Sequence, residues 1–125
     1  MKLLRAATLT VRNAGETADR YRQWLDYRIV EDEAFPRDLA EACGAPASGG
    51  RRTLVLQPAS GAAVFLRLVE GTPPADYRPL RTYGWAAIEI CVEDVLAAHE
   101  RIGRSPFKVI GPPREIEGLP AIYPM

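Results

Sequence analysis

Arg67 and Glu89 are the two residues best suited to chemistry, because each places a charge inside an alternating apolar segment. Arginine presents a planar fork of five donors that suits a carboxylate or a phosphate. Glutamate is an acceptor that works as a base when desolvation raises its pKa. Three interpretations stay open: a structural ion pair between the two, an Arg67 that anchors an anionic ligand, and a catalytic Glu89.

Strand alternation predicts which other side chains share a surface with this pair. If the isoleucines around Glu89 pack under helices, the opposite parity turns Glu89 and Cys91 into a groove. Cys91 has no histidine nearby in sequence and no helix N-terminus beneath it, so we expect a lining group and not a nucleophile. Aromatic rings in the groove would form a wall for a flat ligand. The expected ligand-binding set is Arg67, Thr8, Thr10, Gln57, Cys91, Trp85 and Tyr123.

The chain contains a single histidine, His99. A site that needs two histidines from one chain is therefore excluded. His99 stands in the middle of a predicted helix, between Ala98 and Glu100, so we expect an ordinary surface or helix–sheet contact.

Length and composition are typical of one ordinary globular domain covering 1–125. Hydrophobic residues make up 47% of the 125 residues and charged residues 26%. Sixteen basic residues balance sixteen acidic ones, so we expect no nucleic acid partner. The apolar runs are far shorter than the roughly 20 residues of a membrane span, and a signal-peptide core is missing, so we expect no membrane association. Two cysteines, Cys43 and Cys91, make no multi-bridge framework, which agrees with a cytoplasmic location.

The first half of the chain reads as strand, helix and three further strands. Residues 3–11 alternate as a half-buried strand, and Asn13 with Glu16 forms a capping box at a helix start. A second strand covers 27–34, and a short helix follows Pro36. Strands 52–57 and 63–70 form a hairpin, so the first unit covers about 3–70.

The second half repeats the opening of the first. A proline-rich linker covers 71–84, residues 85–92 alternate as a strand, and a helix follows Glu93 and Asp94 and ends at Gly103. Setting Ala6 against Ala87 aligns Val11 with Val92, which indicates a weak internal repeat. Strands at 107–110 and from 119 onward would follow, within a second unit covering 85–125.

The chain resembles the vicinal oxygen chelate superfamily of glyoxalases, bleomycin resistance proteins and extradiol dioxygenases. The segments that resemble it are the two openings, Ala6 to Val11 and Ala87 to Val95, and the strand Phe65 to Glu70. The resemblance implies an α+β fold of tandem βαβββ units. They form a cupped mixed sheet with helices on the convex side and the ligand in the concave groove. The second unit is expected to be incomplete at its C-terminus, so that either more residues follow or a partner chain completes the sheet.

Metal enzymes of this superfamily take histidine from the first strand of each unit and a carboxylate from the closing strand, since their metals need such lone pairs. The opening positions match Ala6 and Ala87, and the carboxylate position matches Arg67. Alanine offers no lone pair, and the permanent charge of arginine repels a cation. We therefore expect no metal and no other cofactor.

The resemblance implies a glyoxalase- or bleomycin-resistance-like protein that binds a small anionic organic molecule in its groove. The alternative is an enzyme of the same fold, a lyase, isomerase or epimerase with Glu89 as base and Arg67 on the substrate anion. A metal-dependent glyoxalase or dioxygenase stays open only if residues after Met125 or a partner supply ligands. The open edge of the second unit predicts a homodimer.

Overall fold

The computed structural model describes residues 4–78, 81, 87–114 and 117–118. The chain divides into two compact units, Met1–Ile88 and Glu89–Met125.

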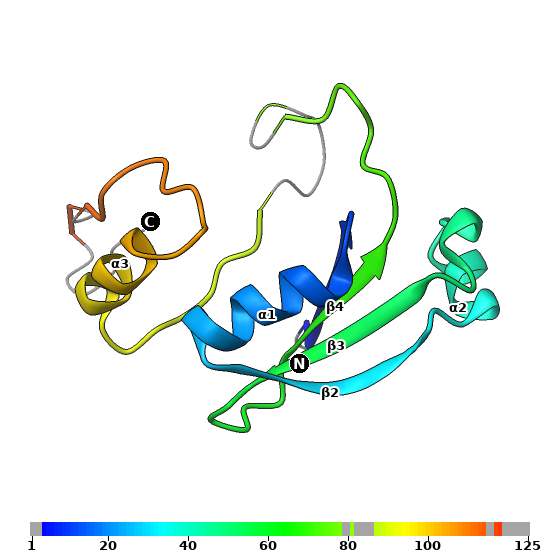
Figure 1. The fold of residues 1–125 in the computed structure, drawn as a ribbon, viewed down its shortest axis with the longest axis horizontal. Coiled ribbons are helices and arrows are strands. Elements are labelled where there is room, and N and C mark those ends of the chain that lie inside the picture. Colours follow the sequence, from blue (N-terminus) through cyan, green and yellow to red (C-terminus); the bar gives the residue numbers. More distant parts are fainter. Residues whose placement is uncertain (1–3, 79–80, 82–86, 115–116, 119–125) are drawn as a thin grey trace. The chain divides into compact units, whose positions relative to one another are not determined.

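The first unit is an α+β structure built on a four-stranded mixed sheet (Figure 1). Its order of elements, strand, helix and three strands, is the one predicted for residues 3–70, with a short helical insertion before the third strand. The sheet order is β1-β4-β3-β2, with β1 parallel to β4 and the other pairs antiparallel. The elements are β1 (Ala6–Val11), α1 (Ala14–Leu25), β2 (Tyr27–Ala34), α2 (Arg37–Ala42), the short helix η1 (Pro46–Ser48), β3 (Arg52–Pro58) and β4 (Phe65–Glu70).

Helix α1 begins where the capping pattern predicts. The Asn13 side chain accepts a hydrogen bond from the backbone N–H of Glu16 at 2.9 Å, which satisfies one of the unpaired donors of the first turn. The backbone N–H of Ala14 donates to Oε1 of Glu70 at 3.1 Å, so the end of β4 also fixes the start of the helix. The helix ends at Asp26, whose φ of 55° turns the chain into β2.

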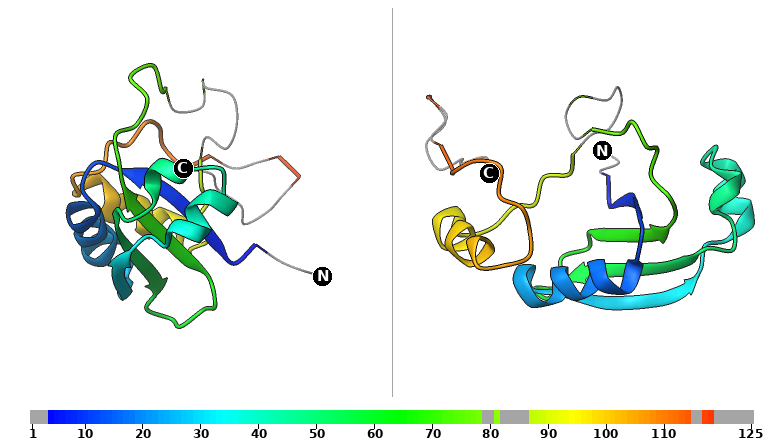
Figure 2. Two further views of the ribbon diagram at one scale, coloured as in Figure 1. Left: turned by 90° about the vertical axis from the view of Figure 1, so that its right-hand side faces the viewer. Right: turned by 45° about the horizontal axis from the view of Figure 1, so that its top comes forward.

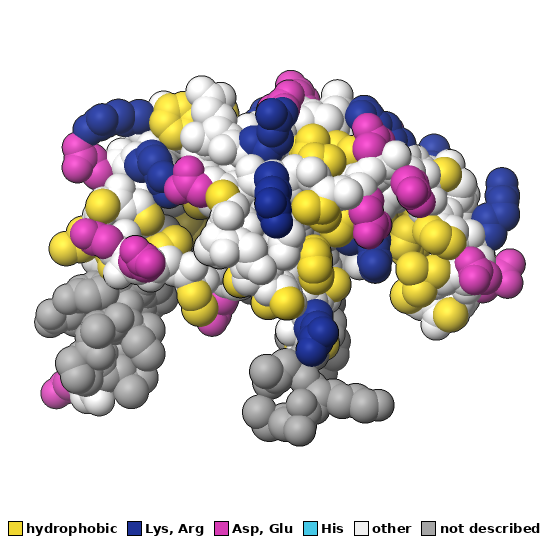
Figure 3. Space-filling model, turned by 90° about the horizontal axis from the view of Figure 1, so that it is seen from below, with side chains coloured by type: hydrophobic (Ala, Val, Ile, Leu, Met, Phe, Trp, Pro, Cys, Tyr) yellow, Lys and Arg dark blue, Asp and Glu magenta, His cyan; other side chains and the backbone are white. Residues whose placement is uncertain are grey.

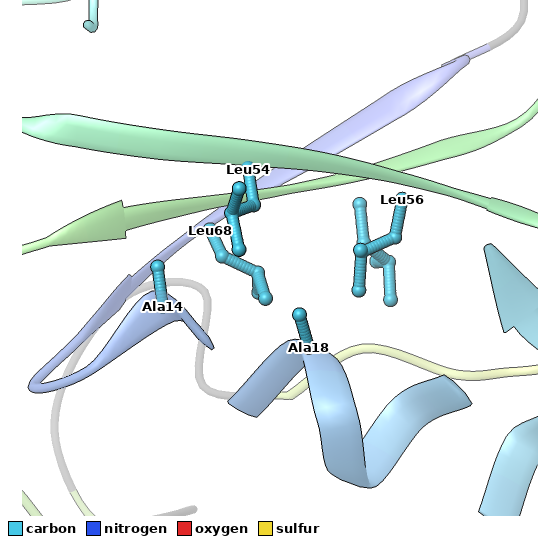
Figure 4. Close-up of a cluster of buried hydrophobic side chains, with 6 residues drawn as sticks. Ala14, Ala18, Leu54, Leu56 and Leu68 are labelled. Atoms are coloured by element: carbon cyan, nitrogen blue, oxygen red, sulfur yellow. The ribbon is translucent and has the colours of Figure 1, made fainter. Parts of the chain in front are cut away.

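The core lies between α1 and one face of the sheet (Figure 4). Small residues on the helix let it approach closely, and leucines on β3 and β4 fill the space below it. Ala7, Leu9 and Val11 of β1 pack against the same cluster, which confirms the predicted parity of that strand. The buried members of the cluster are Ala14, Ala18, Leu54, Leu56, Leu66 and Leu68.

A smaller cluster lies at the other end of the unit. Phe35 and Ala40 bury themselves against Val69, with Leu39 packed beside them. Helix α2 stands beyond the ends of β2 and β3, as two further views show (Figure 2). The short helix predicted after Pro36 is thereby confirmed.

The second unit contains one regular element among its described residues, helix α3 (Val95–Gly103). Oδ1 of Asp94 caps it by accepting from the N–H groups of Leu96 at 2.9 Å and Ala97 at 3.0 Å. Residues 87–92 and 107–110 form no strand, so the prediction of strands there was wrong. A strand needs a neighbour for its backbone groups, and the described part of this unit offers no other strand to pair with.

Other predicted parts of the second half lie partly or wholly outside the described residues. The described stretch 71–78 of the expected linker has neither helix nor strand, whereas the strand expected from 119 onward is outside the description. No helix among the described residues is long and apolar enough to cross a membrane.

Candidate functional site

The candidate site lies on the sheet face opposite α1, which we call the open face. Strand alternation places Thr8, Thr10, Val55 and Arg67 there, because their neighbours Leu9, Leu54, Leu56 and Leu68 point into the helix-covered core. The open face contains a hollow of about 120 Å³. The residues that line the hollow are Ala6, Glu31, Val55, Phe65 and Arg67.

The register of the strands explains why these residues meet. Glu31 of β2 lies opposite Val55 of β3, Val55 lies opposite Arg67 of β4, and Arg67 lies opposite Thr8 of β1. The four residues therefore form one row across the whole sheet. A row of this kind places a cation and a carboxylate on either side of a buried valine.

Arg67 is half-buried, and its contacts leave most of its donors available. Nη1 donates to Oγ1 of Thr8 at 3.4 Å, which is a long hydrogen bond. The guanidinium carbon lies 5.7 Å from the centre of the Phe35 ring, a cation–π distance. Within the described part of the chain, no carboxylate lies within ion-pair distance of Arg67. The side chain is held in place without being neutralised.

Glu31 is the site residue that the sequence pattern did not indicate. Regular alternation from Tyr27 would put Glu31 on the α1 side, with Ile29. A β-bulge between Ile29 and Glu31 inserts an extra residue, Val30, and moves Glu31 to the open face. The adjacent apolar pair Ile29 and Val30 interrupts the alternation of β2, and this interruption is the signal that could have located the bulge.

The other predicted lining residues divide into three groups. Thr8 and Thr10 share the open face with Arg67, as predicted. Gln57 is on the same face, but its amide holds the β3–β4 hairpin: Oε1 accepts from Arg28 at 2.8 Å, and Nε2 donates to the carbonyls of Gly61 and Ala62 at 3.2 and 3.0 Å. Trp85 and Tyr123 lie outside the described residues.

Glu89 and Cys91 belong to the second compact unit, and both are exposed. The ion pair between Arg67 and Glu89, and a catalytic Glu89, therefore stay predictions. Cys43 and Cys91 are both free and exposed. His99 is on α3, where its ring nitrogen Nδ1 is shielded from water and has no hydrogen-bond partner among the residues that the structure describes.

Two of the three positions where the resemblance implies metal ligands lie on the open face. Ala6 and Arg67 both line the hollow, so the strand positions that would carry a histidine and a carboxylate do converge there. The side chains at these two positions supply no lone pair for a metal, and Glu31 is the one carboxylate among the described residues that line the hollow. Among the described residues, no group of three or more histidine, cysteine, aspartate or glutamate residues could hold a metal ion.

Charge is mixed on the surface that Figure 3 displays, where basic and acidic side chains alternate with apolar ones.

In comparisons with known proteins, no protein-family model matches the chain and no curated protein matches it.

Proposed function

We propose that this chain is a glyoxalase- or bleomycin-resistance-like protein that binds a small anionic organic molecule on the open face, without the divalent metal usual in such proteins. The observation that carries the proposal is the state of Arg67. A half-buried guanidinium lines a hollow, and no carboxylate of the described residues neutralises it. A cation removed from part of its water gains most from an anion that brings its own charge.

The surroundings of Arg67 support an organic ligand rather than a simple ion. Val55 and Phe65 give the hollow an apolar floor and wall, and Val55 is only 7% exposed. Such a surface favours the carbon skeleton of a ligand while the guanidinium fork takes its carboxylate or phosphate. Phe35 and Thr8 keep the fork aimed, which reduces the entropy lost on binding.

The proposal includes a larger assembly. We infer a cupped sheet to which the first unit supplies four strands, with β1 and β2 at the edges. Residues 87–92 and 107–110 form no strand in this structure, and we infer that they complete a second βαβββ unit only when another chain offers them a strand to pair with. An edge strand presents unpaired backbone groups that a second copy of the chain can satisfy, which supports a homodimer. A cytoplasmic location is part of the same proposal and is supported by the two free cysteines.

An enzyme of this fold is the second candidate, and the position of Glu31 favours it. A carboxylate on the wall of the hollow that also contains Arg67 could take a proton from a carbon next to the bound acid group. In this version Glu31, or the predicted Glu89, is the base of an isomerase, lyase or epimerase, and Arg67 holds the substrate anion.

Affinity measurements on Arg67 variants test the binding function. Small carboxylates such as isovalerate and benzoate, and inorganic phosphate, are titrated against the full chain, Arg67→Gln and Arg67→Lys, with Arg20→Gln on α1 as the control. Arg67→Gln should bind the anion on the order of tenfold more weakly, because charge-assisted hydrogen bonds are lost. The lysine variant should recover part of the affinity, because it keeps the charge without the fork. An anion that binds the wild type and Arg67→Gln equally well contradicts the proposal.

A further inference from the structure

The hollow on the open face contains two opposite charges that do not neutralise each other. Arg67 and Glu31 both line it, yet no nitrogen of the guanidinium lies within 4.0 Å of the carboxylate, the distance that defines an ion pair here. The carboxylate of Glu31 has no hydrogen-bond or ion-pair partner among the described residues. Two oppositely charged side chains at one site, neither of which neutralises the other, favour a ligand that satisfies both.

We propose that the ligand of this hollow is a zwitterion: a small molecule with a carboxylate for Arg67 and an ammonium group for Glu31, as in an α-amino acid. The inference rests on the proposed anion-binding function and names the class of molecule that the site takes. Each end of such a ligand replaces part of its lost hydration with a charge-assisted hydrogen bond.

The strand register sets the separation of the two charges. Glu31 and Arg67 occupy the same row, with the single residue Val55 of β3 between them. Two strand spacings put their backbones roughly 9–10 Å apart. Both side chains line the same hollow together with Val55, so a small ligand with adjacent carboxylate and ammonium groups can lie between them.

The size and polarity of the hollow favour a small amino acid. Its volume of about 120 Å³ is small beside the roughly 300–1,000 Å³ of common ligand pockets, so it suits a small molecule. The apolar residues that line the hollow are Ala6, Val55 and Phe65, which suit a short aliphatic side chain. A pure anion would meet the carboxylate of Glu31 as a repulsive neighbour, whereas a zwitterion turns the same group into a partner.

A matched set of three ligands tests the inference: L-valine, isovalerate, which lacks the amino group, and isobutylamine, which lacks the carboxylate. Each is titrated into the isotope-labelled full chain, and dissociation constants are taken from backbone amide shifts. L-valine should bind on the order of tenfold more tightly than either partial ligand. If L-valine does not bind, or binds no better than isovalerate, the zwitterion is refuted.

Substitution of Glu31 should affect the affinities for L-valine and isovalerate differently. Glu31→Gln should lower the affinity for L-valine on the order of tenfold, because the ammonium group loses its partner. The affinity for isovalerate should stay the same or rise, because a repulsive charge is removed. Glu33→Gln is the matched control, since Glu33 lies two residues further along the same strand and does not line the hollow. Equal effects of the two substitutions on L-valine would refute a role for Glu31.

The two proposals fail in different ways. Isovalerate that binds as tightly as L-valine, and loses affinity in Arg67→Gln, overturns the zwitterion and keeps the anion-binding function. Isovalerate and L-valine that both bind independently of Arg67 overturn the two proposals together.

Discussion

Removal of the Arg67 charge should cost little folding stability if the side chain is free to bind a ligand. In the described structure the guanidinium has two partners, the Phe35 ring at 5.7 Å and Oγ1 of Thr8 at 3.4 Å. A cation–π contact of this kind contributes about 0.5–1 kcal/mol, and a hydrogen bond this long contributes at most about 0.5 kcal/mol. We therefore expect Arg67→Gln, which keeps most of the stem, to lower the free energy of unfolding by roughly 1 kcal/mol.

The competing interpretation predicts a larger loss. If Arg67 and Glu89 formed a buried ion pair, removing one partner would leave an unpaired buried carboxylate and cost about 3–5 kcal/mol. Adding Glu89→Gln would then restore much of the stability. Urea denaturation followed by circular dichroism separates the cases, with Arg20→Gln as the surface control. A loss above about 3 kcal/mol that Glu89→Gln restores would refute an available Arg67.

Two further predictions concern the helix-covered core. Leu56 is fully buried under α1, so Leu56→Ala should lower the free energy of unfolding by about 2–5 kcal/mol. The control Val30→Ala, at 40% exposure on β2, should lower it far less. Similar losses for both variants in urea denaturation would show that α1 does not cover this face. Burial, and to a smaller extent the neighbouring Tyr27, raises the pKa of Tyr21 above its usual 10.0. The folded state then holds the Tyr21 proton more tightly than the unfolded state, so this contribution to stability is complete below about pH 10 and is lost as pH rises through the raised pKa. Tyr21→Phe should reduce the fall in unfolding free energy between about pH 9 and pH 11, and an unchanged fall would contradict it.

Local patterns in the first unit were sufficient to predict its elements. The cap at Asn13 and the alternation of β1 depend on residues close together in sequence, and both appear as predicted. The sheet order β1-β4-β3-β2 was not predicted, because it depends on pairing between residues that are distant in sequence. Part of the row that contains Arg67 could be predicted, because the regular alternation of β1 and β4 places Thr8 and Arg67 on the same face.

Glu31 could not be placed by parity, since a bulge is decided by pairing between strands and not by the periodicity of one strand. The second unit shows the same limit on a larger scale. Residues 87–92 alternate like a strand, but alternation supplies only a face, and the described part of the second unit contains no strand for them to pair with. The side-chain pattern therefore predicted which face of a regular strand each residue occupies, but it did not predict how the strands pair.

The most direct test of anion binding at the open face is to map where isovalerate binds. Amide chemical shifts of the labelled chain, recorded during a titration, report which residues sense the ligand. The account predicts that the largest shifts fall on Thr8, Val55 and Arg67, in one row of the sheet, and that Arg67→Gln removes them. Shifts concentrated on α1, or a pattern that Arg67→Gln leaves unchanged, would contradict the central claim.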